Sequence, residues 1–98
     1  MIKVTRLYSK DVLQGLEVQG HANSDEYGKD LVCAGVSSIL TGGFNSFYKD
    51  EIEEITLEEG YAKVIINANS ERASIILGVI ETQLLTIEES YPKNIKIK

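Results

Sequence analysis

The sequence has one cysteine, one histidine, one proline and no tryptophan among its 98 residues. A single cysteine cannot form a disulfide within the chain, and this cysteine usage is typical of proteins from a reducing compartment. No basic segment followed by an apolar core begins the sequence, and no apolar run approaches the ~20 residues that cross a bilayer. We therefore expect a cytoplasmic protein with no membrane partner.

Positive charge is also scarce, since 10 Lys and Arg residues stand against 15 Asp and Glu residues, for a formal net charge of -5. Proteins that hold phosphate backbones need clustered Lys and Arg, so this balance argues against direct nucleic-acid binding. The length is that of one compact core. The sequence therefore predicts a single domain over residues 1–98.

The N-terminal part of the sequence predicts a β-hairpin. Residues 2–8 are rich in β-forming side chains, and residues 16–22 alternate between apolar and polar. Turn-forming residues gather between them, around Asp11 and Gly15. Two strands this close in sequence are expected to pair in the antiparallel direction.

A second hairpin is predicted over residues 51–57 and 61–68, with Gly60 at the turn. A short last strand is expected over residues 94–98, because apolar and polar residues alternate there. Together with two helices, these strands give the order β-β-α-β-β-α-β. The expected fold class is α+β, with both helices packed on a mostly antiparallel sheet.

The first helix is expected to begin at Asp30, a good N-cap residue type. Its apolar residues fall on one arc of a helical wheel: Val32, Val36, Ile39, Leu40, Gly43, Phe44 and Phe47. Two adjacent glycines, Gly42 and Gly43, lower the helical propensity by ~1 kcal/mol each relative to alanine. They predict either a break in the helix or a close packing contact.

The second helix is expected from about Ser70, a plausible N-cap, to the residues before Pro92. Its predicted apolar arc contains six residues: Ala73, Ile76, Val79, Ile80, Leu84 and Ile87. Ile75 and Leu85 lie off this arc. The helix thus has more apolar surface than one sheet face would cover, which hints at a partner.

The unique histidine and cysteine, His21 and Cys33, suggest a reactive site. With Asp30 as N-cap, Cys33 would lie in the first helical turn, where unpaired N–H groups and the helix dipole favour a thiolate. An imidazolium at His21 would favour it further and could protonate a leaving amine. The N–H groups of Cys33 and Ala34 could hold an oxyanion.

Other interpretations of these residues stay open. Cys33 could be a buried structural thiol and His21 an ordinary turn residue. Asp30 could cap the helix, which we favour, or orient His21 as a third catalytic member. One histidine and one cysteine fall short of a structural zinc site, so neither a metal nor another cofactor is expected.

Two further features accompany the candidate pair. Ser37 lies one helical turn after Cys33 and could donate a hydrogen bond to the sulfur or to a substrate, or simply be a small packing residue. Residues 22–29 could form a solvated loop or a lid with Gly28 as its hinge. Tyr27 could contact a substrate from this segment or cover the sheet.

Residues 20–38, GHANSDEYGKDLVCAGVSS, strongly resemble the ribosomal-processing cysteine protease family, Prp. The family pattern is Gly-His-Ala, a short variable loop, Gly-x-Asp-x-Val-Cys-Ala and a small-residue stretch with Ser. The matching positions are Gly20, His21, Ala22, Gly28, Asp30, Val32, Cys33, Ala34 and Ser37. The order of elements and the overall length extend the resemblance to essentially the whole chain.

This resemblance implies a cytosolic, homodimeric bacterial endopeptidase that needs no cofactor. Its partner would be the N-terminal extension of a large-subunit ribosomal protein, cut after an aromatic-rich hydrophobic stretch. The family's nucleophile and base correspond to Cys33 and His21. Its active-site loop, which is thought to order around the substrate, corresponds to residues 22–29.

Two alternative functions stay open beside the protease. One is a non-catalytic ribosome-assembly factor that binds the same basic N-terminal tail. The other is a thiol-based acyl-transfer or redox enzyme, although a redox role would ask for a resolving cysteine that the chain lacks.

Overall fold

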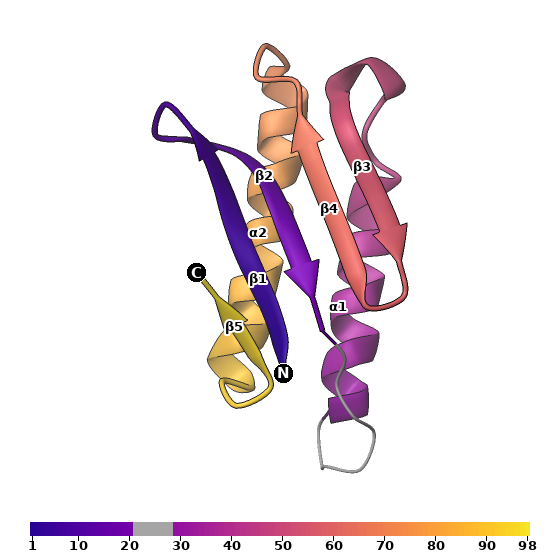
Figure 1. Ribbon diagram of the computed structural model, residues 1–98, viewed down its shortest axis with the longest axis vertical. Helices are drawn as coiled ribbons and strands as arrows, with labels where there is room; N and C mark the ends of the chain where they lie inside the picture. Colours follow the sequence, from indigo (N-terminus) through magenta and orange to yellow (C-terminus); the bar gives the residue numbers. More distant parts are fainter. Residues whose placement is uncertain (21–28) are drawn as a thin grey trace.

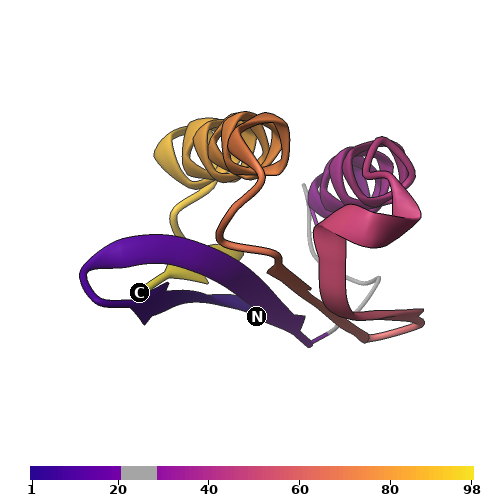
Figure 2. The ribbon, with the colours of Figure 1, turned by 90° about the horizontal axis from the view of Figure 1, so that it is seen from above.

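The computed structural model describes residues 1–20 and 29–98, apart from the side chains of residues 29 and 30. The elements are β1 (Ile2–Ser9), β2 (Val12–Gln19), α1 (Lys29–Phe44), the short 3-10 helix η1 (Lys49–Glu51), β3 (Ile52–Glu58), β4 (Tyr61–Ile66), α2 (Glu71–Ser90) and β5 (Ile95–Ile97). The predicted order β-β-α-β-β-α-β is confirmed (Figure 1). Figure 2 shows both helices on the same face of the sheet, which gives the domain two layers.

The five described strands form one sheet in the order β3-β4-β2-β1-β5. Neighbouring strands pair in the antiparallel direction except β1 and β5, which run parallel with Ile2 opposite Ile95. The sheet is therefore mixed, and mostly antiparallel as predicted. The pairing of β2 with β4 joins the two hairpins and brings the end of β2 beside the β3–β4 turn.

The first hairpin turns earlier than the sequence predicted. Lys10 and Asp11 connect β1 to β2 with φ angles of 52° and 66°, and positive φ at both central residues is the signature of a type I′ turn. Gly15, expected at the turn, instead lies inside β2, where a Cβ would come within 2.4 Å of the carbonyl oxygen of Val64. This glycine is needed because the backbone of β4 passes so close, not because the chain reverses there.

The core forms between the helices and the covered face of the sheet. The buried residues of α1 are four members of its predicted arc: Val32, Val36, Leu40 and Phe44. The buried residues of α2 are Ala73, Leu77, Ile80 and Leu84. The predicted arc of α2 was wrong in part, because it omitted Leu77 and included Val79, whose side chain is 54% exposed.

Helix α1 continues through both glycines and ends at Phe44. A Cβ on Gly43 would lie 2.6 Å from two side-chain carbons of Ile80 on α2. Around Gly42, in contrast, no atom lies within 4 Å of such a Cβ. Of the two alternatives that the sequence left open, close packing is therefore correct, and Gly43 alone provides it.

The start of α2 is fixed by a polar network around the buried carboxylate of Glu51. Ser70 accepts a hydrogen bond from the N–H of Ala73 at 3.1 Å, which confirms it as the N-cap. The hydroxyl of Ser70 donates to Glu51 at 2.8 Å, and the N–H of Tyr48 donates to the same carboxylate at 2.7 Å. Arg72 pairs with Glu51 and stacks over the ring of Tyr48, 3.8 Å from its centroid.

Candidate active site

A pocket of about 250 Å³ lies between α1, the end of β2 and the β3–β4 turn. These segments meet at one end of the domain, the lower end in Figure 1. The lining residues are Ile2, Val18, Gly20, Cys33, Val36, Ser37, Leu40, Leu57, Glu58, Glu59, Gly60, Tyr61 and Ala62. The pocket thus combines apolar walls with acidic side chains at the hairpin turn.

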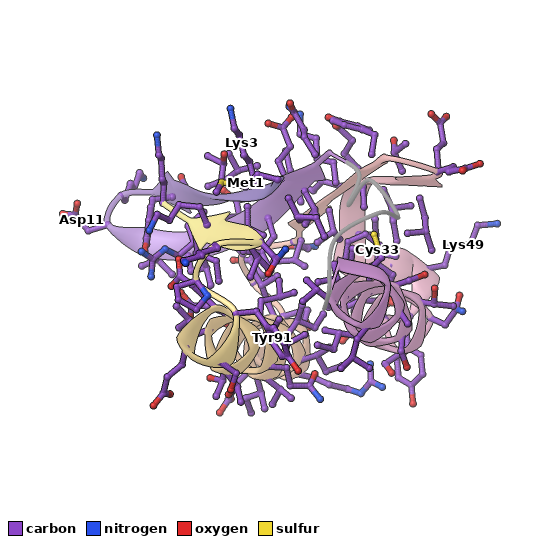
Figure 3. The ribbon with its side chains drawn as sticks, turned by 90° about the horizontal axis from the view of Figure 1, so that it is seen from below. Met1, Lys3, Asp11, Cys33, Lys49 and Tyr91 are labelled. Atoms are coloured by element: carbon purple, nitrogen blue, oxygen red, sulfur yellow. The ribbon has the colours of Figure 1, made fainter. Side chains whose placement is uncertain are left out.

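Cys33 belongs to the wall that α1 contributes to this pocket. Figure 3 shows its side chain pointing from α1 toward the sheet. The residue is partly buried and packs against the hydrophobic core, yet it also lines the pocket. Its thiol is therefore neither sealed in the core nor projected into solvent, and a group in the pocket can approach it.

The start of α1 differs from the prediction. The helix begins at Lys29, so Asp30 lies inside its first turn rather than before it. Because an α-helix leaves only its first four N–H groups without an intrahelical partner, the amides of Cys33 and Ala34 fall beyond those positions. The helix bounds therefore do not support an oxyanion hole built from these two amides, and that role stays a prediction. The side-chain type of Asp30 signalled a helix start, but such signals locate it only to within one or two residues.

Ser37 lies one helical turn after Cys33 and lines the same pocket, as the helical spacing predicted. Ala34 faces away from the core as an exposed residue. The structure therefore brings Cys33 and Ser37 together, and it leaves Ala34 outside the pocket lining.

Gly20 brings the end of β2 to the pocket. Its φ angle is 109°, and a Cβ at this position would lie 2.4 Å from the carbonyl oxygen of Met1. Its N–H donates to the carbonyl of Gly60 at 3.1 Å, which ties the end of β2 to the β3–β4 turn. Since His21 follows Gly20 directly, the chain reaches the candidate histidine from a residue that lines the Cys33 pocket.

Several sequence-predicted site positions lie outside the described residues. They are His21, Ala22, Tyr27 and Gly28, together with the side chain of Asp30. Among the described residues, the structure therefore places Gly20, Cys33 and Ser37 around one pocket.

The sequence analysis missed the contribution of the second hairpin. Glu58 and Glu59 both line the pocket together with Leu57. Tyr61, on the adjacent strand, donates its hydroxyl proton to Glu17 at 2.8 Å, and this hydrogen bond raises the pKa of Tyr61. No local pattern could have revealed these neighbours, because they reach the pocket only through the pairing of β4 with β2.

Two other properties concern the described residues alone. None of their helices is both long and apolar enough to pass through a membrane. Nowhere in residues 1–20 and 29–98 do three or more potential metal-binding side chains gather.

Comparison with known proteins gives matches over nearly the whole chain. The family described as "Cysteine protease Prp" matches residues 1–96. Ribosomal processing cysteine protease Prp of Mycoplasma genitalium is 39% identical over 84 residues, which cover 84% of each chain.

Two crystal structures of the essential ribosomal processing protease Prp from S. aureus have the same fold. The complex with a substrate peptide gives a TM-score of 0.88 at 30% sequence identity and covers 100% of this chain and 98% of that chain. The complex with a covalently linked product peptide gives a TM-score of 0.83 with the same identity and coverage. On this family match and this shared fold, the chain belongs to the cysteine protease Prp family.

Proposed function

We propose that this cysteine protease removes the N-terminal extension of a bacterial large-subunit ribosomal protein, cutting after an aromatic-rich hydrophobic stretch. Cys33 acts as the nucleophile and His21 as the general acid and base. The observation that carries the proposal is that the only cysteine lines an open pocket together with Gly20, the residue before the only histidine.

The proposed reaction proceeds through a thioester. The thiolate of Cys33 attacks the scissile carbonyl carbon, and the C–N bond breaks as His21 gives a proton to the leaving amine. His21 then takes a proton from water, which attacks the thioester and releases the new C-terminal acid with the thiol restored. The covalently linked product peptide of the S. aureus protease supports a covalent route.

Supporting roles are proposed for residues near this pair. Ser37 donates a hydrogen bond to the sulfur or to the substrate, since it lines the pocket beside Cys33. Asp30 holds the start of α1 by placing a negative charge in its first turn. The proposed substrate-contacting positions in and before the segment 22–29 are Gly20, Ala22, Tyr27 and Gly28.

The cellular setting completes the proposal. The enzyme acts in the cytoplasm without a cofactor or direct nucleic-acid binding, and as a homodimer. The outer face of α2 supports a second chain as partner, because Ile75 and Val79 are 62% and 54% exposed there. Light scattering during gel filtration tests this, and a shift to the monomer mass is expected for the double variant Ile75→Ser, Val79→Ser. A wild-type chain of monomer mass would contradict it.

The deciding experiment is a cleavage assay read by mass spectrometry. The purified protein is mixed with a synthetic peptide that spans the ribosomal protein's extension, with Cys33→Ala and Cys33→Ser as controls. We expect one cut after the aromatic stretch and a loss of at least about 10³-fold in both variants. Circular dichroism should show that both variants keep the fold. Cleavage by Cys33→Ala would overturn the mechanism, and binding without cleavage would favour an assembly factor.

A further inference from the structure

Strand β3 forms one edge of the sheet beside the Cys33 pocket. Within the described part of the chain it pairs only with β4, so its other side is open. An open edge presents unpaired N–H and C=O groups, which an extended peptide can use to join the sheet as an additional strand. The end of this edge reaches the candidate active site, because Leu57 and Glu58 line the Cys33 pocket.

The hydrogen-bond pattern tells which residues of β3 face the open side. The N–H of Asn67 donates to the carbonyl of Glu51 at 2.7 Å. Asn67 and Glu51 are the chain neighbours of Ile66 and Ile52, which lie opposite each other across the ladder. A hydrogen bond between such neighbours occurs where the N–H and C=O groups of the two opposite residues point away from each other. The pair Ile52–Ile66 is therefore a non-hydrogen-bonded pair.

Pairs of the two kinds alternate along an antiparallel ladder. A register shift between Ile52 and Glu54 interrupts the β3–β4 ladder, so the alternation beyond it is set by the bond from the N–H of Gly20 to the carbonyl of Gly60. This bond makes Gln19–Tyr61 a non-hydrogen-bonded pair of the β2–β4 ladder, so the next residues of β4 that bond to β2 are Ala62 and Val64. Toward β3, Val64 and Ala62 are therefore the non-hydrogen-bonded positions. Their partners across the ladder are Ile55 and Leu57. The N–H and C=O groups of Ile55 and Leu57 thus point to the open side of β3.

The side chains of the same two residues are available as well. Ile55 and Leu57 lie opposite Val64 and Ala62, which are 0% and 3% exposed under the helices. Ile55 and Leu57, however, are 42% and 45% exposed. The helical layer thus covers β4 but leaves an apolar strip along β3, and Leu57 continues this strip into the Cys33 pocket.

The charged side chains of β3 and its turn are all acidic, and one of them, Glu54, pairs with Lys63 of β4 at 3.0 Å. From residue 52 to residue 60 the chain has four glutamates, Glu53, Glu54, Glu58 and Glu59, and no Lys or Arg. Glu58 and Glu59 line the pocket beyond the apolar strip. A peptide with a hydrophobic stretch followed by basic residues, as expected at the start of a ribosomal protein, matches this succession of apolar and acidic surface.

We propose that the hydrophobic stretch of the substrate binds as a sixth strand along the open edge of β3. Its backbone pairs with Ile55 and Leu57, alternate side chains cover these two residues, and its C-terminal end leads the scissile bond to Cys33. This inference rests on the proposed function for the identity of the peptide. The open edge of β3 is then the surface that selects a hydrophobic, extended segment of the substrate.

Amide hydrogen exchange on the Cys33→Ala protein tests the binding mode without cleavage. The probe is a synthetic peptide of an aromatic-containing hydrophobic stretch followed by lysines. Saturating peptide should slow exchange at the amides of Ile55 and Leu57 by about tenfold or more. The amide of Thr56, which faces Lys63 within the existing ladder, is the internal control and should change little. Unchanged exchange at Ile55 and Leu57 with bound peptide would overturn the proposal.

Modified peptides and a protein variant give independent measurements. N-methylation at successive peptide positions should weaken binding with a period of two, because only alternate amides pair with a neighbouring strand. Leu57→Asn should lower kcat/KM by about tenfold. The matched control is Val12→Asn, since Val12 is 59% exposed on a strand and lies outside the pocket lining. An equal effect of both variants would contradict the proposal.

The two proposals can fail separately. Protection of Ile55 and Leu57 by a peptide that the wild-type protein never cuts would support the sixth strand and overturn the proteolysis. Cleavage that depends on Cys33, combined with N-methyl peptides whose binding does not alternate from one position to the next, would support the proteolysis and overturn the sixth strand.

Discussion

Gly20 lies against Met1 so closely that a Cβ at this position would come within 2.4 Å of the Met1 carbonyl oxygen. The φ angle of 109° also belongs to the region that side chains rarely adopt. Close approach and backbone conformation therefore exclude a side chain for two separate reasons. Because Gly20 lines the Cys33 pocket, this contact fixes where the chain leaves β2 and starts toward His21.

We expect Gly20→Ala to lower both stability and activity. The new methyl group must displace the Met1 carbonyl or change φ, which should cost about 1–3 kcal/mol in the free energy of unfolding. Since the displacement occurs at the pocket, kcat/KM should fall by more than the loss of folded protein explains. Urea denaturation and the peptide cleavage assay measure the two effects. A wild-type free energy of unfolding together with a wild-type kcat/KM would contradict this prediction, because the Met1 carbonyl would then move aside without cost.

The two glycines of α1 should respond to alanine in opposite directions. Gly42→Ala adds a methyl group in open space and should stabilise the protein by up to about 1 kcal/mol through helix propensity. Gly43→Ala places a methyl group 2.6 Å from buried Ile80 and should destabilise it by about 1–3 kcal/mol. Thermal and urea unfolding compare the two variants. In a protein that already has Ile80→Val, the change in the free energy of unfolding caused by Gly43→Ala should differ from the change in the wild type, because the side chains at positions 43 and 80 occupy the same space.

The contribution of Glu51 should depend on pH. The N–H of Tyr48, and then Ser70 and Arg72, lower the pKa of this carboxyl from its ordinary value of 4.5, and they outweigh the opposing effect of burial. A folded-state pKa below the unfolded value means that the stabilisation is present above pH 4.5 and is lost as pH falls through the folded pKa. Glu51→Gln should therefore unfold at lower urea than the wild type at pH 7, with a gap that narrows below pH 4.5. A constant gap from pH 7 to pH 3 would contradict this linkage.

Reaction with iodoacetamide tests whether His21 acts on Cys33. We expect the wild-type thiol to alkylate rapidly, since Cys33 lines an accessible pocket and the thiolate is the reactive form. His21→Gln should slow alkylation by about tenfold if an imidazolium favours that form. Intact-mass spectrometry follows the single modification, and Val12→Asn, which lies outside the pocket lining, serves as the control. Equal rates in wild type and His21→Gln would contradict the catalytic pair.

Local signals predicted several elements correctly. Ser70 is predictable as the cap of α2 because its hydroxyl suits an N-cap and the following residues have helical spacing. Gly60 was placed at the second turn, and its φ of 79° explains why glycine is favoured there. Each of these features depends on residues a few positions apart in the chain, so the sequence pattern contained the necessary information.

Other features depend on contacts between distant segments and could not be predicted locally. The omission of Leu77 from the predicted arc of α2 is not one of them, because Ala73, Leu77, Ile80 and Leu84 follow the spacing of one helix face and Val79 lies off it. Leu57 lines the pocket only because the hairpin to which it belongs joins the sheet beside β2. The candidate cysteine was found from the sequence alone, but the surface opposite it was not.

Strand β5, which is synthesised after the other four strands, pairs with β1, which is synthesised first. Its parallel ladder sets Ile95 opposite Ile2 and Ile97 opposite Val4, and Ile95 is fully buried. A nascent chain that has emerged only through α2 would still present one side of β1 as an unpaired edge. The domain is thus expected to complete its folding only after residues 95–97 have left the ribosomal tunnel, and chains truncated before β5 should be prone to aggregation.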